Sequence, residues 1–221
     1  NIITNRPLLA VILANFFNSF KSVGGSSESY FWLNNTGSLL NQTICGLFTG
    51  IPNYIMVPIA AKMVKKWGAR ATSIIAGLFG FFAYMTLFFV GFHPFGQTFK
   101  DHYIFNLIWV IFGLTICGLP NKILNVSGQI VTAEALDYME WKHGLRNEAL
   151  VTTVQGYFGK LATSVTGWLS GMVLTWINYV PLTDSLGNAV PQTDPTMLNG
   201  IWAVFCILPA LARGLYGVSF I

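Results

Sequence analysis

Long apolar runs separated by short polar segments dominate the chain. Several of these runs exceed the roughly 18 residues that a helix needs to cross about 30 Å of hydrocarbon. The pattern predicts an all-α membrane protein with six transmembrane helices. We place them at about residues 8–33, 39–61, 71–92, from 103 onward, 149–177, and from 198 to the end. Gly118, Leu119 and Pro120 predict a break in the fourth span, because proline removes a backbone donor. Tyr30 and Trp32 predict a membrane-interface belt at the end of the first.

Composition supports the membrane assignment. Only 9% of the residues are charged and 53% are hydrophobic, whereas a soluble domain carries roughly 25% charged residues. The net charge of +4 does not gather into a basic motif, so we expect no nucleic-acid partner. Cys45, Cys117 and Cys206 lie far apart inside apolar runs, where cysteine behaves as a small hydrophobe.

The distribution of basic residues along the chain predicts its orientation in the membrane. Cytoplasmic loops of membrane proteins carry an excess of Lys and Arg. An N-terminus in the cytoplasm leaves only Lys100 in an outside loop. It places seven basic residues in cytoplasmic segments: Arg6, Lys62, Lys65, Lys66, Arg70, Lys142 and Arg146. We therefore expect a multi-pass protein of the cytoplasmic (inner) membrane with both termini in the cytoplasm.

Four cations lie inside predicted spans: Lys21, Lys122, Lys160 and Arg213. Ionisable groups inside a membrane cost roughly 2.5–3.5 kcal/mol and usually face a protein interior or a water-filled cavity. The alternative is that the side chain reaches back to the membrane surface. For Lys160 we favour a cavity, and for Lys21 and Lys122 both interpretations stay open. For Arg213 we favour a position at the lipid headgroups.

Polar residues concentrate in the first, second, fourth and fifth spans, including Asn121 and Gln155. The third and sixth spans are nearly pure hydrocarbon. This distribution predicts four helices lining a polar surface and two packed outside against lipid. We see no pore ring typical of a channel. We also see no nucleophile–base pair or acid–base cluster typical of an enzyme, so we expect a transporter, not an enzyme, with no metal site.

A charge-dense segment, residues 132–160, separates the fourth and fifth spans. Its core reads Ala133-Glu134-Ala135-Leu136-Asp137-Tyr138-Met139-Glu140-Trp141-Lys142-His143-Gly144-Leu145-Arg146-Asn147-Glu148. This run resembles the signature between helices ten and eleven of the glycoside–pentoside–hexuronide:cation symporters, a melibiose-carrier-like family of the major facilitator superfamily. Residues 5–9, 65–70, 179–181 and 208–211 also match the family. Glu134, Met139, His143 and Ala69 depart from its pattern.

The resemblance covers essentially the whole chain as the C-terminal bundle of the family fold, helices seven to twelve. It implies sugar:cation symport by alternating access. Lys160 matches the lysine of helix eleven that faces the central cavity in the family, which makes it our first candidate for the substrate cavity. Lys122, Lys21, Asn121 and Gln155 are weaker candidates. The cytoplasmic loop, at about residues 134–148, supplies the expected gate: Asp137, Tyr138, Glu140, Arg146 and Glu148.

The resemblance also implies partners. The coupling cation, Na⁺ or H⁺, is expected on acids of an N-terminal six-helix half that lies outside this sequence, and no other cofactor is expected. The polar face needs that half or a second copy to cover it. Buried cations with few buried acids favour an anionic glycoside such as a glucuronide. The alternative function is a non-transporting six-helix partner or regulatory subunit.

Overall fold

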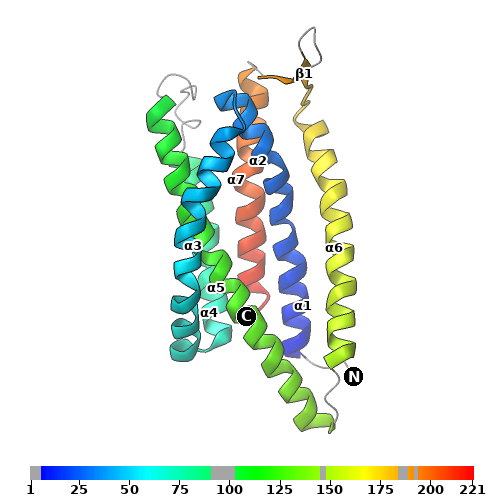
Figure 1. Ribbon diagram of the computed structural model, residues 1–221. Helices are drawn as coiled ribbons and strands as arrows, with labels where there is room; N and C mark the ends of the chain where they lie inside the picture. Colours follow the sequence, from blue (N-terminus) through cyan, green and yellow to red (C-terminus); the bar gives the residue numbers. More distant parts are fainter. Residues whose placement is uncertain (1–5, 91–102, 145–147, 184–188, 192–193) are drawn as a thin grey trace.

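The computed structural model describes the backbone of residues 6–90, 103–144, 148–183, 189–191 and 194–221. Arg146 of the expected gate and Lys100 of the expected outside loop lie outside these residues. The fold is all-α, as predicted, apart from one short antiparallel hairpin near the end of the chain (Figure 1). The elements are α1 (Arg6–Ser19), α2 (Lys21–Thr36), α3 (Leu40–Trp67), α4 (Ala69–Val90), α5 (Tyr103–His143), α6 (Glu148–Trp176), β1 (Leu182–Thr183), β2 (Ala189–Val190) and α7 (Pro195–Val218).

The first predicted span consists of two helices. α1 and α2 follow one another in nearly the same direction and meet at Phe20 (Figure 1). The amide of Phe20 donates to the carbonyl of Phe17, and the amide of Val23 donates to the carbonyl of Phe20, so the winding is locally tighter than an α-helix. Hydroxyl groups on both sides bond to backbone carbonyls, Ser19 to Asn15 and Ser22 to Ser19. Such bonds compete with the helix ladder and bend helices.

Within the described chain, five helical stretches are long and apolar enough to cross a membrane: 7–36, 40–67, 69–90, 103–142 and 195–218. The fifth predicted span corresponds to α6, which is 29 residues long and runs beside α1 along the bundle (Figure 1). Glycine, serine and threonine residues, together with Gln155 and Lys160, interrupt its apolar residues, and it is not among the five stretches. In its length and place α6 matches the other helices of the bundle. In its composition it does not.

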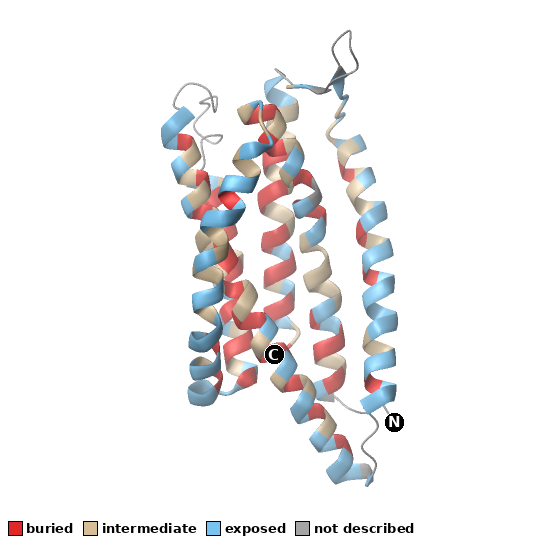
Figure 2. Ribbon diagram, in the orientation of Figure 1, coloured by how far each residue is buried: buried red, intermediate tan, exposed pale blue. Residues whose placement is uncertain are grey.

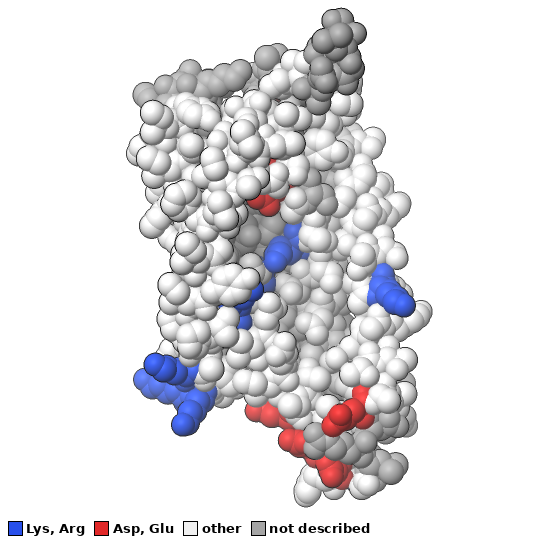
Figure 3. Space-filling view, viewed as in Figure 1, with Lys and Arg blue, Asp and Glu red and all other residues white. Residues whose placement is uncertain are grey.

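Both termini of the described chain and the α3–α4 turn lie at the lower end of the bundle in Figure 1, where α5 extends beyond the other helices. Figure 3 shows basic side chains over the α3–α4 turn and acidic side chains at the tip of α5. The basic side chains of the α3–α4 turn thus lie at the same end of the bundle as the tip of α5. Which compartment this end faces remains a prediction.

The segment expected as a cytoplasmic loop is mostly helical. α5 continues without interruption to His143, and the left-handed Gly144, with φ 66°, ends it. Residues 134–143 are therefore the last turns of a 41-residue helix. The predicted break at Pro120 is also wrong, because α5 passes through this proline. Helices inside membranes tolerate proline where neighbouring groups satisfy the freed carbonyl.

The core is centred on α7, contrary to the prediction that the last span packs outside against lipid. In the most apolar stretch of α7, 56% of the residues are buried, compared with 11% in α3. Figure 2 shows the same contrast. Phe205 of α7 stacks on Phe31 of α2 with ring centroids 5.2 Å apart. Trp32 is fully buried in the same cluster, so its assignment to an interface belt was wrong. The three cysteines are buried and free, as predicted.

Glycines allow α7 to approach its neighbours. The ring of Pro209 occupies the space that a side chain on Gly24 of α2 would need. A Cβ on Gly77 of α4 would lie 2.7 Å from the Cα of Gly217. Helices in membranes associate by such backbone contact because burial from lipid supplies little hydrophobic driving force.

A buried hydrogen bond joins α4 to α5. The hydroxyl of Ser73 donates to the hydroxyl of Ser127 at 2.9 Å, and both residues are fully buried. A double-mutant cycle of Ser73→Ala and Ser127→Ala is expected to give a coupling free energy of about 0.6 kcal/mol, the average for such bonds in membranes. The measurement is thermal unfolding in detergent. Thr86 bonds only the carbonyl of Phe82 in its own helix, so a cycle of Thr86→Ala with Ser127→Ala should give no coupling. Equal coupling in both cycles would contradict the contribution of this bond.

Candidate functional site

Two cavities follow the seam between α1/α2 and α5. The upper cavity has a volume of about 210 Å³ and the lower one about 400 Å³. The upper cavity is lined by α2, α3, α4, α5 and α7, and the lower one by α1, α5, α6 and α7. Figure 3 shows this face hollowed along its centre, with an acidic side chain above and basic side chains below it. Charged groups in the middle of a bundle of apolar helices mark a working surface.

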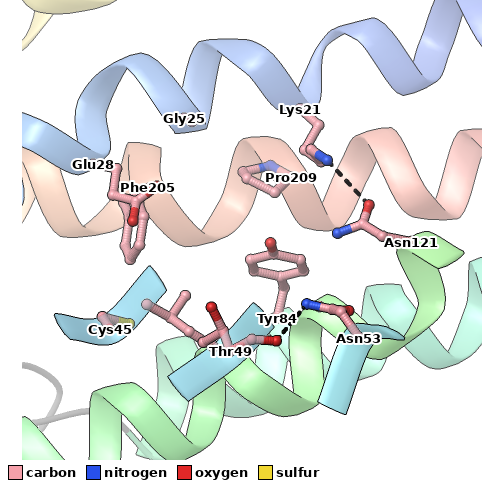
Figure 4. A pocket seen from close by; sticks show the side chains of 13 residues that line it. Lys21, Gly25, Glu28, Cys45, Thr49, Asn53, Tyr84, Asn121, Phe205 and Pro209 are labelled. Atoms are coloured by element: carbon pink, nitrogen blue, oxygen red, sulfur yellow. Dashed lines mark hydrogen bonds between the residues drawn. The ribbon is translucent and has the colours of Figure 1, made fainter. Parts of the chain in front are cut away.

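Lys21 and Asn121 meet in the upper cavity. The ammonium of Lys21, the first residue of α2, donates to Oδ1 of Asn121 in α5 at 3.0 Å (Figure 4). Both were predicted as cavity residues, and the structure brings them together from positions 100 residues apart. The amide satisfies one of the three ammonium donors and leaves the positive charge unneutralised. A substrate oxygen could therefore take one of the other donors.

Gln155 and Lys122 lie close to this contact, in different settings. Gln155 of α6 lines the lower cavity, and its Nε2 donates to the hydroxyl of Thr132 at 3.4 Å. Lys122 follows Asn121 in sequence, but its ammonium lies over the ring of Tyr54, 5.1 Å from the centroid. A cation over an aromatic face is held electrostatically. Lys122 thus adds positive charge between α3 and α5 without lining either cavity.

Lys160 lies apart from both cavities. It is exposed, whereas Ala162, two residues later on α6, is fully buried. Two residues span about 200° around a helix, so Lys160 points away from the face that α6 turns to α1. In the described chain, that direction leads out of the six-helix bundle. The strongest sequence candidate for the site therefore lies on an open face.

The described gate candidates occupy two helix ends. Asp137, Tyr138 and Glu140 lie in the last turns of α5, and Glu148 begins α6. The ring of Tyr138 lies 6.0 Å from that of Trp141, and the ammonium of Lys142 lies 5.6 Å from the Tyr138 ring. With about 1.5 Å of rise per residue, Asp137 lies roughly 24 Å along α5 from Asn121. These residues therefore lie far from the Lys21–Asn121 contact, whereas the lower cavity reaches Thr132, five residues before Asp137 on the same helix.

Arg213 is the most deeply buried cation. Its exposed fraction is 0%, so the prediction that it reaches the lipid headgroups was wrong. Its Nη1 donates to Oδ1 of Asn18 at 2.8 Å, while its Nε and Nη2 have no partner within the described part of the chain. The aliphatic part of the side chain lies against Gly80 of α4. Arg213 therefore carries its charge into the core beside the α1–α2 junction.

Sequence reasoning missed several polar residues that line the cavities. Thr49, Asn53 and Glu28 line the upper cavity and Asn18 lines the lower one. Nδ2 of Asn53 donates to the carbonyl of Thr49 at 2.8 Å, while its Oδ1 has no partner among the described residues. The signal that could have found Glu28 is its position, since it is the one acidic residue of the sequence within a predicted span. No group of three or more His, Cys, Asp or Glu side chains is placed to hold a metal ion in the described chain.

Comparisons with known proteins agree with a transport role. A family model described as MFS/sugar transport protein matches residues 1–217. An uncharacterized symporter of Bacillus subtilis (strain 168) is 30% identical over 214 residues, which cover 96% of this chain and 42% of the relative. A putative sulfoquinovose importer of Escherichia coli (strain K12) is 35% identical over 89 residues, 38% of this chain and 18% of the relative.

An isoprimeverose transporter of Lactiplantibacillus pentosus is 28% identical over 96 residues, 42% of this chain and 18% of the relative. The chain thus spans less than half the length of these curated relatives. No solved structure matches it.

Proposed function

Because the chain belongs to the MFS/sugar transport protein family, we propose that it forms the C-terminal half of a carrier that moves an anionic sugar across the cytoplasmic membrane in symport with Na⁺ or H⁺. The family and the relatives are transporters, which confirms the prediction that the chain is not an enzyme. The observation that carries the proposal is the Lys21–Asn121 contact in a cavity enclosed by apolar helices. Charged groups inside a membrane cost free energy, and those that are present mark substrate and ion pathways.

The proposed mechanism is alternating access, with the groove of Figure 3 facing a second six-helix half. Substrate sites of such carriers lie near the membrane midplane between two repeats, and one repeat rocks against the other. Lys160 is exposed and points out of the bundle described here, so a second half that packs on this side would cover it. Both termini, with the end of α5, would lie in the cytoplasm, and the acidic end of α5 would close the inner gate.

An anionic substrate is supported by charge. Lys21, Lys122 and Arg213 surround the two cavities, and Glu28 is the single acid among the cavity residues. One relative is named as a putative importer of sulfoquinovose, a sulfonated sugar. Another is named for the disaccharide isoprimeverose, so a neutral glycoside is the competing substrate class.

The test is uptake of methyl β-D-glucuronide and methyl β-D-glucoside by membrane vesicles containing the full-length carrier. The expected result is a preference for the glucuronide that Lys21→Gln reduces by about tenfold, since a hydrogen bond to a charged group contributes roughly 1.5–3 kcal/mol. Lys160→Gln should reduce it as well. Lys65→Gln is the matched control, because Lys65 lies exposed at the end of α3, far from the groove.

Equal uptake of the two sugars, changed by neither Lys21→Gln nor Lys160→Gln, would contradict an anionic substrate. Absence of uptake of both sugars by a folded, membrane-inserted protein would favour the non-transporting partner.

A further inference from the structure

Glu28 is the one acidic residue of the sequence that lies within a predicted membrane span. The sequence has eight acidic residues. Of the other seven, two lie outside the described residues and five lie near the ends of α5, α6 and α7. Glu28 lies in the middle of α2 and lines the upper cavity. Its Oε1 accepts a hydrogen bond from Nε1 of the buried Trp32 at 3.4 Å, which is long for such a bond. One weak neutral donor does not replace the water that an ionised carboxylate loses on burial.

Lys21 is the basic group within reach of Glu28. The two residues are seven positions apart on α2, which places them on the same face about 10 Å apart along the axis. Figure 4 shows both side chains extending from α2 toward the cavity. The ammonium of Lys21 nevertheless bonds the neutral Asn121, and no Lys or Arg forms an ion pair with Glu28 among the described contacts. The one acid and the one cation that line this cavity are therefore not paired in this state.

We propose that Glu28 is a proton-binding site of this half of the carrier, and that its carboxylate and the anionic group of the substrate compete for Lys21. The inference rests on the proposed function, which is symport of an anionic sugar with a cation. It adds that the coupling cation is a proton. With Glu28 protonated, Lys21 is available to the substrate, as in the observed contact with Asn121. With Glu28 ionised, the ammonium turns to the carboxylate, and the anionic substrate loses its partner.

The cycle balances charge and atoms. On the outer side a proton forms an O–H bond with the Glu28 carboxylate, and the sugar anion then binds Lys21. On the inner side the O–H bond breaks, the proton passes to water, and Lys21 returns to Glu28 as the sugar leaves. One proton accompanies one monoanion, so transport is electroneutral.

The other groups that face this cavity do not replace Glu28. Cys45 of α3 and Tyr84 of α4 are the remaining titratable side chains that line it. α5 contributes Asn121 and α7 contributes Phe205 and Pro209, none of which titrates. The charged residues nearby on these two helices are held elsewhere: Lys122 by Tyr54 and Arg213 by Asn18. A carboxyl group ionises at lower pH than a thiol or a phenol, with ordinary pKa values of about 4.3, 8.5 and 10. Glu28 is therefore the group among these three that most readily releases a proton to water at neutral pH.

The experiment uses the full-length carrier in proteoliposomes with methyl β-D-glucuronide as the probe. In the wild type, an imposed pH gradient should drive accumulation, and affinity for the probe should fall by up to about tenfold per pH unit once Glu28 ionises. Glu28→Gln should lower gradient-driven accumulation at least tenfold and make affinity independent of pH. Counterflow without a gradient should fall less. Glu28→Asp, which keeps a carboxyl group, should recover coupling.

Four outcomes separate the inference from the proposed function. If Glu28→Gln accumulates the probe with the pH dependence of the wild type, the proton site is overturned and symport stands. If accumulation follows a Na⁺ gradient alone, the proton site is likewise overturned and symport stands. Equal loss of counterflow and accumulation in Glu28→Gln and Glu28→Asp would assign Glu28 to structure and overturn the proton site.

If the wild type transports no probe, the proposed substrate fails. Infrared spectroscopy then tests Glu28 without substrate. A protonated-carboxyl band that titrates in the wild type and is missing in Glu28→Gln supports the site, and an unchanged band overturns it.

Discussion

Gly77→Val is expected to prevent the bundle from assembling. A Cβ at this position would lie 2.7 Å from the Cα of Gly217, 2.8 Å from its nitrogen and 2.9 Å from the carbonyl oxygen of Arg213. These are backbone atoms of α7, which cannot move aside as a flexible side chain could. Overpacking usually costs about 1–3 kcal/mol when side chains can adjust, so we expect a cost above about 3 kcal/mol here. The measurement is the yield of monodisperse protein in mild detergent and its melting temperature.

Gly46→Val is the matched control. Gly46 lies on the exposed side of α3, where a Cβ meets nothing within 4 Å. The same change in volume and propensity should therefore leave yield and melting temperature close to those of the wild type. If both variants melt alike, close backbone contact between α4 and α7 does not determine the stability of this bundle.

Asn18→Leu is expected to destabilise the fold by about 3 kcal/mol, because it leaves another donor of a buried charged group without a hydrogen bond. Oδ1 of Asn18 accepts the one hydrogen bond that the fully buried guanidinium of Arg213 makes within the described chain. The bond also ties the end of α1 to α7, next to the α1–α2 junction. Thermal unfolding in detergent measures the loss.

Arg213→Met should behave differently. It removes the charge together with its unsatisfied donors, and an apolar side chain of similar length in place of a buried ion is often neutral or stabilising. We therefore expect a change within about 1 kcal/mol, and we expect Arg213→Met to rescue Asn18→Leu in the double variant. A larger loss from Arg213→Met than from Asn18→Leu would show that the guanidinium stabilises the core through groups other than Asn18.

The helices could be predicted from the sequence because apolar runs of spanning length have few alternatives in a membrane. The junction at Phe20 could not. It arises from hydroxyl-to-carbonyl bonds of Ser19 and Ser22, and such residues also occur in continuous helices. Pro120 shows the reverse, since a residue that breaks helices in water lies inside a continuous helix here. Side-chain chemistry close to the backbone determines these details, and hydropathy does not report it.

The part of the site that consists of polar side chains in apolar spans could be predicted from the sequence. Lys21 and Asn121 were identified because polar groups in apolar spans face a protein interior, and they do make contact. The burial of Trp32 and Arg213 depends instead on which helices surround α7, and no pattern within a single helix contains that information. The role of Lys160 depends on a surface that this chain does not supply, so it stays a prediction.

Because α5 is continuous, a tilt of this helix at the upper cavity would also move its acidic end. Met139 lies 18 residues beyond Asn121 on one continuous helix, a distance of about 27 Å at 1.5 Å per residue. Tilting this rod by about 10° at Asn121 would sweep its tip through roughly 5 Å, by the same helix geometry. A small tilt of α5 at the Lys21–Asn121 contact would thus appear at the end of the helix as a displacement of several ångströms. A spectroscopic label near residue 139 would therefore follow events in the cavity without touching it.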